Sequence, residues 1–218
     1  MRYSEIKEVR GEFASDNPKE LAALRKERDA NFEKYIGIIK RNCQPYLSQV
    51  DDPISLYKGT TRKTAEFQRK KVRLDDRRPV GASGTEHVAY NEYFKSEFGA
   101  PFRNSVLVTG SHMDARSFGT NIRIVFPAGE FRFVWSPKVN DINMSIGFRS
   151  AKPRTIPELV ANMVQYEYRD DNLQAAIDSG NEIMIRCKEY YTINYHAYLE
   201  HEADVRKQTG YDITRLFK

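Results

Sequence analysis

The stretch GNEIMIR, residues 180–186, predicts a short strand with a carboxylate at its opening. Gly180 and Asn181 are turn-forming residues, and Glu182 stands between that turn and three apolar residues. The stretch YYTI, residues 190–193, follows closely and has the aromatic and β-branched composition of a second strand. Together they predict a β-sheet core in which Glu182 lies at a strand end.

Other strand-like runs lie upstream, and turn-forming residues bound them. They are residues 54–57, 106–108, 122–126 and 131–135. Most connections are too short for a crossover helix, so the strands are expected to form mainly antiparallel pairs. The basic segment 60–78 has no apolar run to bury and is expected to be a loop.

Capping residues and apolar residues at helical spacing predict four helices. They are expected from about residue 18 to before Pro45, over 85–98, from 155 onward and over about 196–208. The chain is therefore predicted to be an α+β protein. A helical segment over residues 1–50 precedes a domain over residues 51–218.

The length of 218 residues and the hydrophobic content of 40% allow one domain with a full core and a helical appendage. The net charge of +5 favours an anionic ligand or partner. Because the basic residues are spread along the chain, nucleic acid is an allowed but not a required partner.

The two cysteines, Cys43 and Cys187, lie far apart and lack the spacing of a disulfide framework or a zinc site. His196 and His201 are five residues apart, which does not place them one helical turn apart for a metal, so no metal is expected. The N-terminus carries no apolar run for a signal peptide or a membrane span. We therefore expect an intracellular protein without membrane association.

Three segments carry candidate chemistry: LYKG at residues 56–59, VLVTGS at residues 106–111, and Glu182 with the strand that it opens. Each has an ordinary alternative. Glu182 is also typical of an exposed strand edge, the sequence 109–111 is typical of a turn, and Lys58 is typical of a solvated strand end.

In this order, the three segments resemble the Arg/Ser/Glu signature of the ADP-ribosyltransferases. The resemblance spans about residues 54–195 and includes a short helix at 114–119 and a strand that ends in Pro127-Ala128-Gly129, similar to the family's Pro-x-Gly. It is closest in kind to the small accessory ADP-ribosyltransferases of tailed bacteriophages, which have a helical segment before the first motif.

The resemblance implies a fold of two packed, mainly antiparallel β-sheets with an N-terminal helical layer, and NAD+ between the sheets as the substrate. It implies that Glu182 is the catalytic residue, which would stabilise an oxocarbenium-like ribose by accepting hydrogen bonds from its hydroxyls. The implied NAD+-binding residues are Tyr57, Lys58, Gly59, Thr109, Gly110, Ser111 and Phe118, with core packing as the alternative for Phe118.

The resemblance also implies the biology. ADP-ribose would be transferred to a host macromolecule, and a protein of translation or transcription is the expected target. The expected location is the cytoplasm of an infected host cell, and incorporation into the virion stays open.

Two positions depart from the family pattern. Lys58 stands where the family usually has arginine, and a lysine neutralises a phosphate without the planar bidentate contact, which Arg62 or Arg103 would have to supply. Gly180 stands where arginine-modifying members carry a second glutamate, so the target need not be arginine. Asp178 is the nearest substitute in the sequence.

Two rival hypotheses follow from these departures and from the charge. Lys58, Gly110 and Gly180 favour a non-catalytic phage structural or binding protein that retains the transferase fold. The basic residues between 58 and 78 favour, more weakly, a nucleic-acid-binding module whose affinity falls steeply with salt. The acceptor, the modified residue type and the oligomeric state are not determined by the sequence.

Overall fold

The computed structural model describes residues 18–62, 64–75, 77, 83–147, 155–209, 214 and 217. Contacts divide the chain into two compact units, residues 1–38 and 39–218. This boundary falls inside the first described helix, α2 (Pro18–Asn42). The predicted end of the helical segment, residue 50, lies just after the short helix α3 (Gln44–Leu47).

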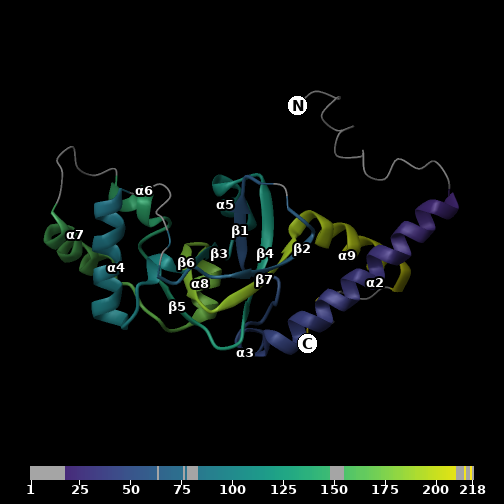
Figure 1. The fold of residues 1–218 in the computed structure, drawn as a ribbon, viewed down its shortest axis with the longest axis horizontal. Coiled ribbons are helices and arrows are strands. Elements are labelled where there is room, and N and C mark those ends of the chain that lie inside the picture. The colour runs from purple at the N-terminus through teal and green to yellow at the C-terminus, as the bar shows by residue number, and fades with distance from the viewer. Residues whose placement is uncertain are drawn as a thin grey trace, which may run out of the picture. The chain divides into compact units, whose positions relative to one another are not determined.

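The described strands form one seven-stranded antiparallel sheet in the order β2-β7-β4-β1-β3-β6-β5 (Figure 1). The strands are β1 (Tyr57–Thr60), β2 (Phe67–Lys71), β3 (Val106–Thr109), β4 (Asn121–Ala128), β5 (Arg132–Trp135), β6 (Glu182–Arg186) and β7 (Glu189–Asn194). The predicted α+β class and antiparallel pairing are confirmed. The prediction of two sheets is wrong for the part of the chain that the structure describes.

The sheet is continuous at its centre through a single residue pair, Tyr57 of β1 opposite Thr109 of β3. On either side the pairing is more extensive, since β1 pairs with β4 over four residues and β3 pairs with β6 over four residues. Two well-paired halves, β2-β7-β4-β1 and β3-β6-β5, therefore meet at a narrow seam. Without this one pair, the two halves would be two separate sheets. A single pairing of this kind cannot be predicted from the pattern of residues.

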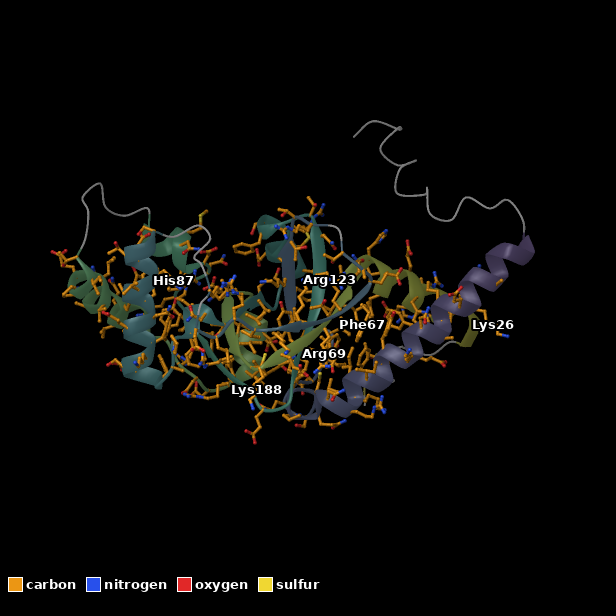
Figure 2. The ribbon with its side chains drawn as sticks, viewed as in Figure 1. Lys26, Phe67, Arg69, His87, Arg123 and Lys188 are labelled. Atoms are coloured by element: carbon orange, nitrogen blue, oxygen red, sulfur yellow. The ribbon has the colours of Figure 1, made fainter. Side chains whose placement is uncertain are left out.

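The expectation of a loop over residues 60–78 is wrong because it contains strand β2. Its apolar residue Phe67 stacks on Tyr191 of β7, with ring centroids 5.7 Å apart. Arg69 donates two hydrogen bonds, of 2.9 and 2.7 Å, to the Glu189 carboxylate of β7 (Figure 2). A strand that depends on cross-strand partners needs no apolar run of its own.

Arg123 of β4, labelled in Figure 2, joins residues 65 and 66, just before β2, to the sheet by hydrogen bonds. Its side chain is only 1% exposed, and it donates hydrogen bonds of 2.8 Å to the carbonyls of Ala65 and Glu66 and of 3.0 Å to the Thr192 hydroxyl. Burial of this guanidinium is tolerated because its donors are paired.

The remaining described helices, all in the larger unit, connect or cover these strands. They are α4 (Gly84–Phe98), α5 (His112–Ala115), α6 (Ile142–Gly147), α7 (Ile156–Met163), α8 (Leu173–Ser179) and α9 (Tyr195–Thr209), with 3-10 turns η1 (Phe102–Asn104), η2 (Arg116–Phe118) and η3 (Val164–Tyr166).

Local capping signals decide where two of these helices begin. Ser83 and Glu86 form a capping box at α4, two residues before the predicted helix start at residue 85. Gly99 ends that helix in the left-handed region, directly after the predicted end at residue 98. A capping box of Thr155 and Glu158 opens α7, where the sequence predicts a helix from residue 155 onward. Between α4, α7 and the β5–β6 half of the sheet lies a core cluster of Tyr90, Phe94, Phe102, Val134, Met163 and Met184, all fully buried.

Glycines allow backbone segments to approach the seam closely. A Cβ on Gly59 of β1 would lie 1.9 Å from the Ala115 carbonyl oxygen, and a Cβ on Gly110 would lie 1.8 Å from the Ile177 carbonyl oxygen. Both distances are far inside van der Waals contact. A side chain at either position would push α5 from β1 or α8 from the end of β3.

We expect Gly110→Ala to lower the free energy of unfolding by roughly 1–3 kcal/mol, because overpacking displaces backbone and not a flexible side chain. Gly84→Ala is the matched control, since nothing lies within 4 Å of its added Cβ and alanine favours the helix. Urea unfolding of the two variants and the wild-type protein measures the difference. Equal stability of the two variants would contradict the close-approach argument.

Candidate functional site

A cavity of about 180 Å³ opens at the seam where β1 and β3 stop pairing. Six of the eight predicted site residues line it: Tyr57, Lys58, Gly59, Thr109, Phe118 and Glu182. Gly110 and Ser111 do not. The lining also contains residues that the sequence analysis did not single out, namely Arg77, Leu107, Val108, Asp114, Ala115, Asn140 and Asn143.

Glu182 is the first residue of β6 and lies opposite Thr109 of β3. It is only 7% exposed, so the alternative of an exposed strand-edge glutamate is wrong. Arg103 Nη1 donates a hydrogen bond of 3.0 Å to Glu182 Oε1, and Arg103 itself is buried. Burial raises the pKa of Glu182, while Arg103 opposes the rise and Asp141 adds to it.

Lys58 reaches across the seam, and its Nζ lies 3.3 Å from the Leu107 carbonyl oxygen of β3. Burial lowers the pKa of Lys58 to about 8, and repulsion from Arg77 and Lys70 contributes to the decrease. Its half-buried position and its hydrogen bond to β3 distinguish Lys58 from a fully solvated strand-end lysine. Lys58 is a partly buried amine that faces the same cavity as Glu182.

Arg77 is the arginine that lines the cavity. It donates a hydrogen bond to the Ser105 carbonyl, and burial, followed by repulsion from Arg103, lowers its pKa. Arg103 is committed to Glu182, and the exposed Arg62 does not line the cavity, so neither takes the compensating role considered for it. The sequence signal for Arg77 was only its place in a basic segment.

The hydroxyl residues of the VLVTGS segment are engaged by the backbone. Thr109 Oγ1 donates to the Gly180 carbonyl and accepts from the Ser111 amide. Ser111 caps helix α5 by accepting a hydrogen bond of 3.2 Å from the Asp114 amide. The hydroxyl donor of Thr109 is thus used to join β3 to the turn before β6, and Ser111 and Gly110 act in local packing at this position.

Two aromatic residues flank the cavity. The Tyr57 hydroxyl donates to the Ile54 carbonyl at 2.7 Å, and its ring packs edge-on against Tyr195 and His112. Phe118, by contrast, is 50% exposed, so the alternative of core packing is wrong for Phe118. The cavity therefore has one fixed aromatic wall and one aromatic residue at an open rim.

Gly180 ends helix α8 with φ +70°, in the left-handed region where glycine is favoured. Asp178 lies on α8, exposed, and accepts a hydrogen bond of 2.8 Å from Gln174, so it does not line the cavity. The acidic side chain beside Gly180 is instead Asp114, whose Oδ2 lies 3.4 Å from the Cβ position that a side chain at 180 would have. Asp114 lines the cavity.

The described residues contain no group of three or more His, Cys, Asp and Glu side chains arranged to hold a metal ion. His196 forms an exposed pair with Glu200 on α9 at 3.4 Å. Cys43 and Cys187 are free and buried, and burial raises the pKa of each thiol to about 12, which leaves both unreactive near neutral pH. In the described part of the chain, no helix combines the length and apolar character needed to span a bilayer.

Comparison with known proteins adds no relative. No protein-family model matches the sequence, and neither a curated protein nor a solved structure is significantly similar to the chain. Functional inference therefore depends on the cavity, its charges and the resemblance of the three short motifs.

Lys58 is expected to give the protein a specific pH dependence. An amine whose pKa falls from 10.5 to about 8 on folding binds fewer protons in the folded state, so its contribution to stability increases as pH rises from about 8 to about 10.5. The wild-type protein should therefore gain stability relative to Lys58→Met over this range. Urea unfolding at pH 7, 9 and 10 measures the difference, and a constant difference between the two proteins would show that Lys58 is not desolvated.

Proposed function

We propose that this protein is a mono-ADP-ribosyltransferase that cleaves the nicotinamide–ribose bond of NAD+ and transfers ADP-ribose to a host macromolecule. The observation that carries the proposal is the meeting, in one cavity, of a buried carboxylate, Glu182, and two cationic side chains, Lys58 and Arg77. These groups come from three separate segments of the chain. Two of them, Lys58 and Glu182, stand in the motifs that resemble the family.

Glu182 supplies the electrostatic stabilisation. When the bond between ribose C1′ and the nicotinamide nitrogen breaks, its electron pair leaves with nicotinamide and positive charge develops on the ribose. An ionised Glu182 stabilises that charge and accepts hydrogen bonds from the ribose hydroxyls, and the low dielectric of the buried site strengthens both interactions. The acceptor then forms a bond to C1′ and loses a proton.

The cations are suited to the pyrophosphate of NAD+. Burial is the main cause that lowers the pKa of Lys58 and of Arg77, and repulsion from neighbouring cations adds to the decrease. A bound phosphate relieves this repulsion, because it places negative charge among donors that otherwise repel one another. Lysine contributes a point charge, and Arg77 contributes the planar guanidinium that position 58 lacks.

The size of the cavity limits what it encloses. Pockets that bury drug-sized ligands are roughly 300–1,000 Å³, whereas this cavity is about 180 Å³. It would enclose the nicotinamide ring and the adjoining ribose, the pyrophosphate would contact Lys58 and Arg77 of its lining, and the adenosine would lie over the rim near Phe118. A flat ring is compatible with the aromatic wall formed by Tyr57.

The acceptor is proposed to be a host protein, in translation or transcription, in the cytoplasm of an infected cell. Free arginine is expected to be a poor acceptor, since its guanidinium keeps its proton at neutral pH and position 180 carries no second glutamate. The carboxylate beside that position is Asp114, on a different segment of the chain. The alternative function is binding of the nucleotide without turnover by a phage structural or binding protein. Engagement of the Thr109 hydroxyl by Gly180 favours that alternative, because the hydroxyl donor is not free to orient Glu182.

We expect Glu182→Gln to fold normally and to lose about two to three orders of magnitude in NAD+ consumption, the range for removing one preorganised electrostatic group. Asp178→Asn is the matched control, because it neutralises an exposed carboxylate outside the cavity. Nicotinamide release in the presence of a bacterial lysate, with circular dichroism for folding, measures the effect. Binding of NAD+ without consumption by the wild-type protein would instead support the non-catalytic alternative.

We expect Lys58→Ala to weaken NAD+ binding and Lys58→Arg to bind at least as tightly as the wild-type protein, because arginine adds a bidentate phosphate contact. Lys188→Ala is the control for loss of a cation, since Lys188 is exposed and lies outside the cavity (Figure 2). Titration calorimetry with NAD+ gives the affinities. Identical affinities for all four proteins would remove residue 58 from the site.

A further inference from the structure

The Arg103–Glu182 ion pair is almost completely buried. Arg103 is 4% exposed and Glu182 is 7% exposed, and the hydrogen bond between them is 3.0 Å long. Taking two charges out of water costs about as much as their attraction returns, so a buried ion pair is weak evidence for a purely stabilising role. The geometry of the pair indicates another role.

Arg103 uses its two terminal nitrogens for two different partners. Nη1 donates to Glu182 Oε1, and Nη2 donates to Asn143 Oδ1 at 3.2 Å. Among the described residues, no hydrogen bond reaches the other carboxylate oxygen, Glu182 Oε2, and both Glu182 and Asn143 line the cavity. One oxygen of Glu182 is therefore held by the protein, and the other is left for a ligand.

The backbone around Arg103 is fixed by hydrogen bonds to α4 and by core packing. The Arg103 backbone amide donates a hydrogen bond of 3.0 Å to Asn91 Oδ1 of α4. The side chain of the neighbouring Asn104 forms hydrogen bonds with His87 and Asn91 of the same helix (Figure 2). Phe102, on the other side of Arg103, is fully buried in the core cluster. The Arg103 side chain therefore extends from a backbone segment that is packed against the core.

Asn143 is held as well. Its backbone amide donates to Asp141 Oδ1 at 2.7 Å, which fixes the first turn of α6. Arg103 therefore ties the carboxylate on β6 to the cavity wall formed by α6. This side-chain link adds to a backbone hydrogen bond of 2.9 Å from the Glu182 amide to the Asn140 carbonyl.

The charges around Glu182 make Arg103 the principal counterion. Burial raises the pKa of Glu182, and Arg103 is the largest influence in the opposite direction. The other charged or titratable groups that interact with Glu182 are Asp141, Arg77, Lys58 and Tyr168. Without Arg103, the carboxylate would lose both its counterion and its hydrogen-bond donor, and its pKa would rise further.

We propose that Arg103 is a positioning residue, which holds Glu182 by Oε1 as an ionised, correctly oriented carboxylate and presents Oε2 to the substrate ribose. This inference rests on the proposed function, and it adds a residue that lies outside the three family-like motifs. Arg103 does not line the cavity, so it acts through Glu182 and Asn143.

The first test uses Arg103→Met, Arg103→Lys and, as the control, Arg62→Met, which removes an exposed arginine outside the cavity. In NAD+ consumption, Arg103→Met should lower kcat at least tenfold with KM changed less than threefold, and the acid-side midpoint of the pH profile should move to higher pH. In Arg103→Lys, the midpoint should return most of the way to the wild-type value, whereas kcat should recover only in part. A wild-type kcat and pH profile for Arg103→Met would overturn the proposal.

The second test needs no activity. A carboxyl whose pKa is raised on folding binds its proton more tightly in the folded state, so Glu182 lowers stability as pH rises through that raised value. Glu182→Gln should remove this dependence in urea unfolding between pH 4 and 8, and Arg103→Met should extend it to higher pH. If Arg103→Met does not fold, Arg103→Lys is compared in the same way.

The two tests separate the two claims. Absence of NAD+ consumption by the wild-type protein would end the proposed function, while the pH dependence of stability would still report on the pair. A Glu182 contribution that is the same with and without Arg103 would overturn the positioning role even in an active enzyme.

Discussion

The site depends on how little of β1 and β3 is paired. Tyr57 and Thr109 form the one register pair between these two described strands, and the residues beyond it, Lys58, Gly59, Leu107 and Val108, line the cavity. Had the pairing continued, Lys58 and Gly59 would face a neighbouring strand and no cavity would exist between them. Residues of β1 and β3 therefore form walls of the cavity, next to Glu182 at the start of β6.

Several charged side chains lie close together at this seam, and their burial costs free energy of desolvation. Lys58, Arg77 and Arg103 lie near Glu182, and burial together with mutual repulsion lowers the pKa of both Lys58 and Arg77. A folded protein tolerates such a cluster when a ligand or a paired counterion compensates it. Arg103 and Glu182 compensate each other, which leaves Lys58 and Arg77 as the cations suited to an anionic ligand.

The small residues of the motifs have structural duties that their resemblance to a binding signature does not reveal. Gly59 and Gly110 permit backbone contacts that a Cβ would block, and Ser111 caps α5. Thr109 joins β3 to the turn at Gly180 through its hydroxyl. These contacts keep the seam in place, so the motif contributes to the cavity by shaping its walls as much as by lining it.

The sequence by itself determined what depends on near neighbours. The Thr155–Glu158 capping box, the helix end at Gly99, the short strands after residue 100 and the place of Glu182 at a strand opening all follow from residues a few positions apart. It failed for β2, whose partners Tyr191 and Glu189 lie on β7.

Only the tertiary structure decided the single sheet with its one-pair seam, the burial of Glu182, and the arrival of Arg77 and Asp114 at the cavity. It also decided that Arg103, 79 residues before Glu182 in the chain, is the counterion. The physical reason is that desolvation and long-range pairing depend on segments distant in sequence, whereas caps, turns and strand periodicity are set by local sterics and hydrogen bonding.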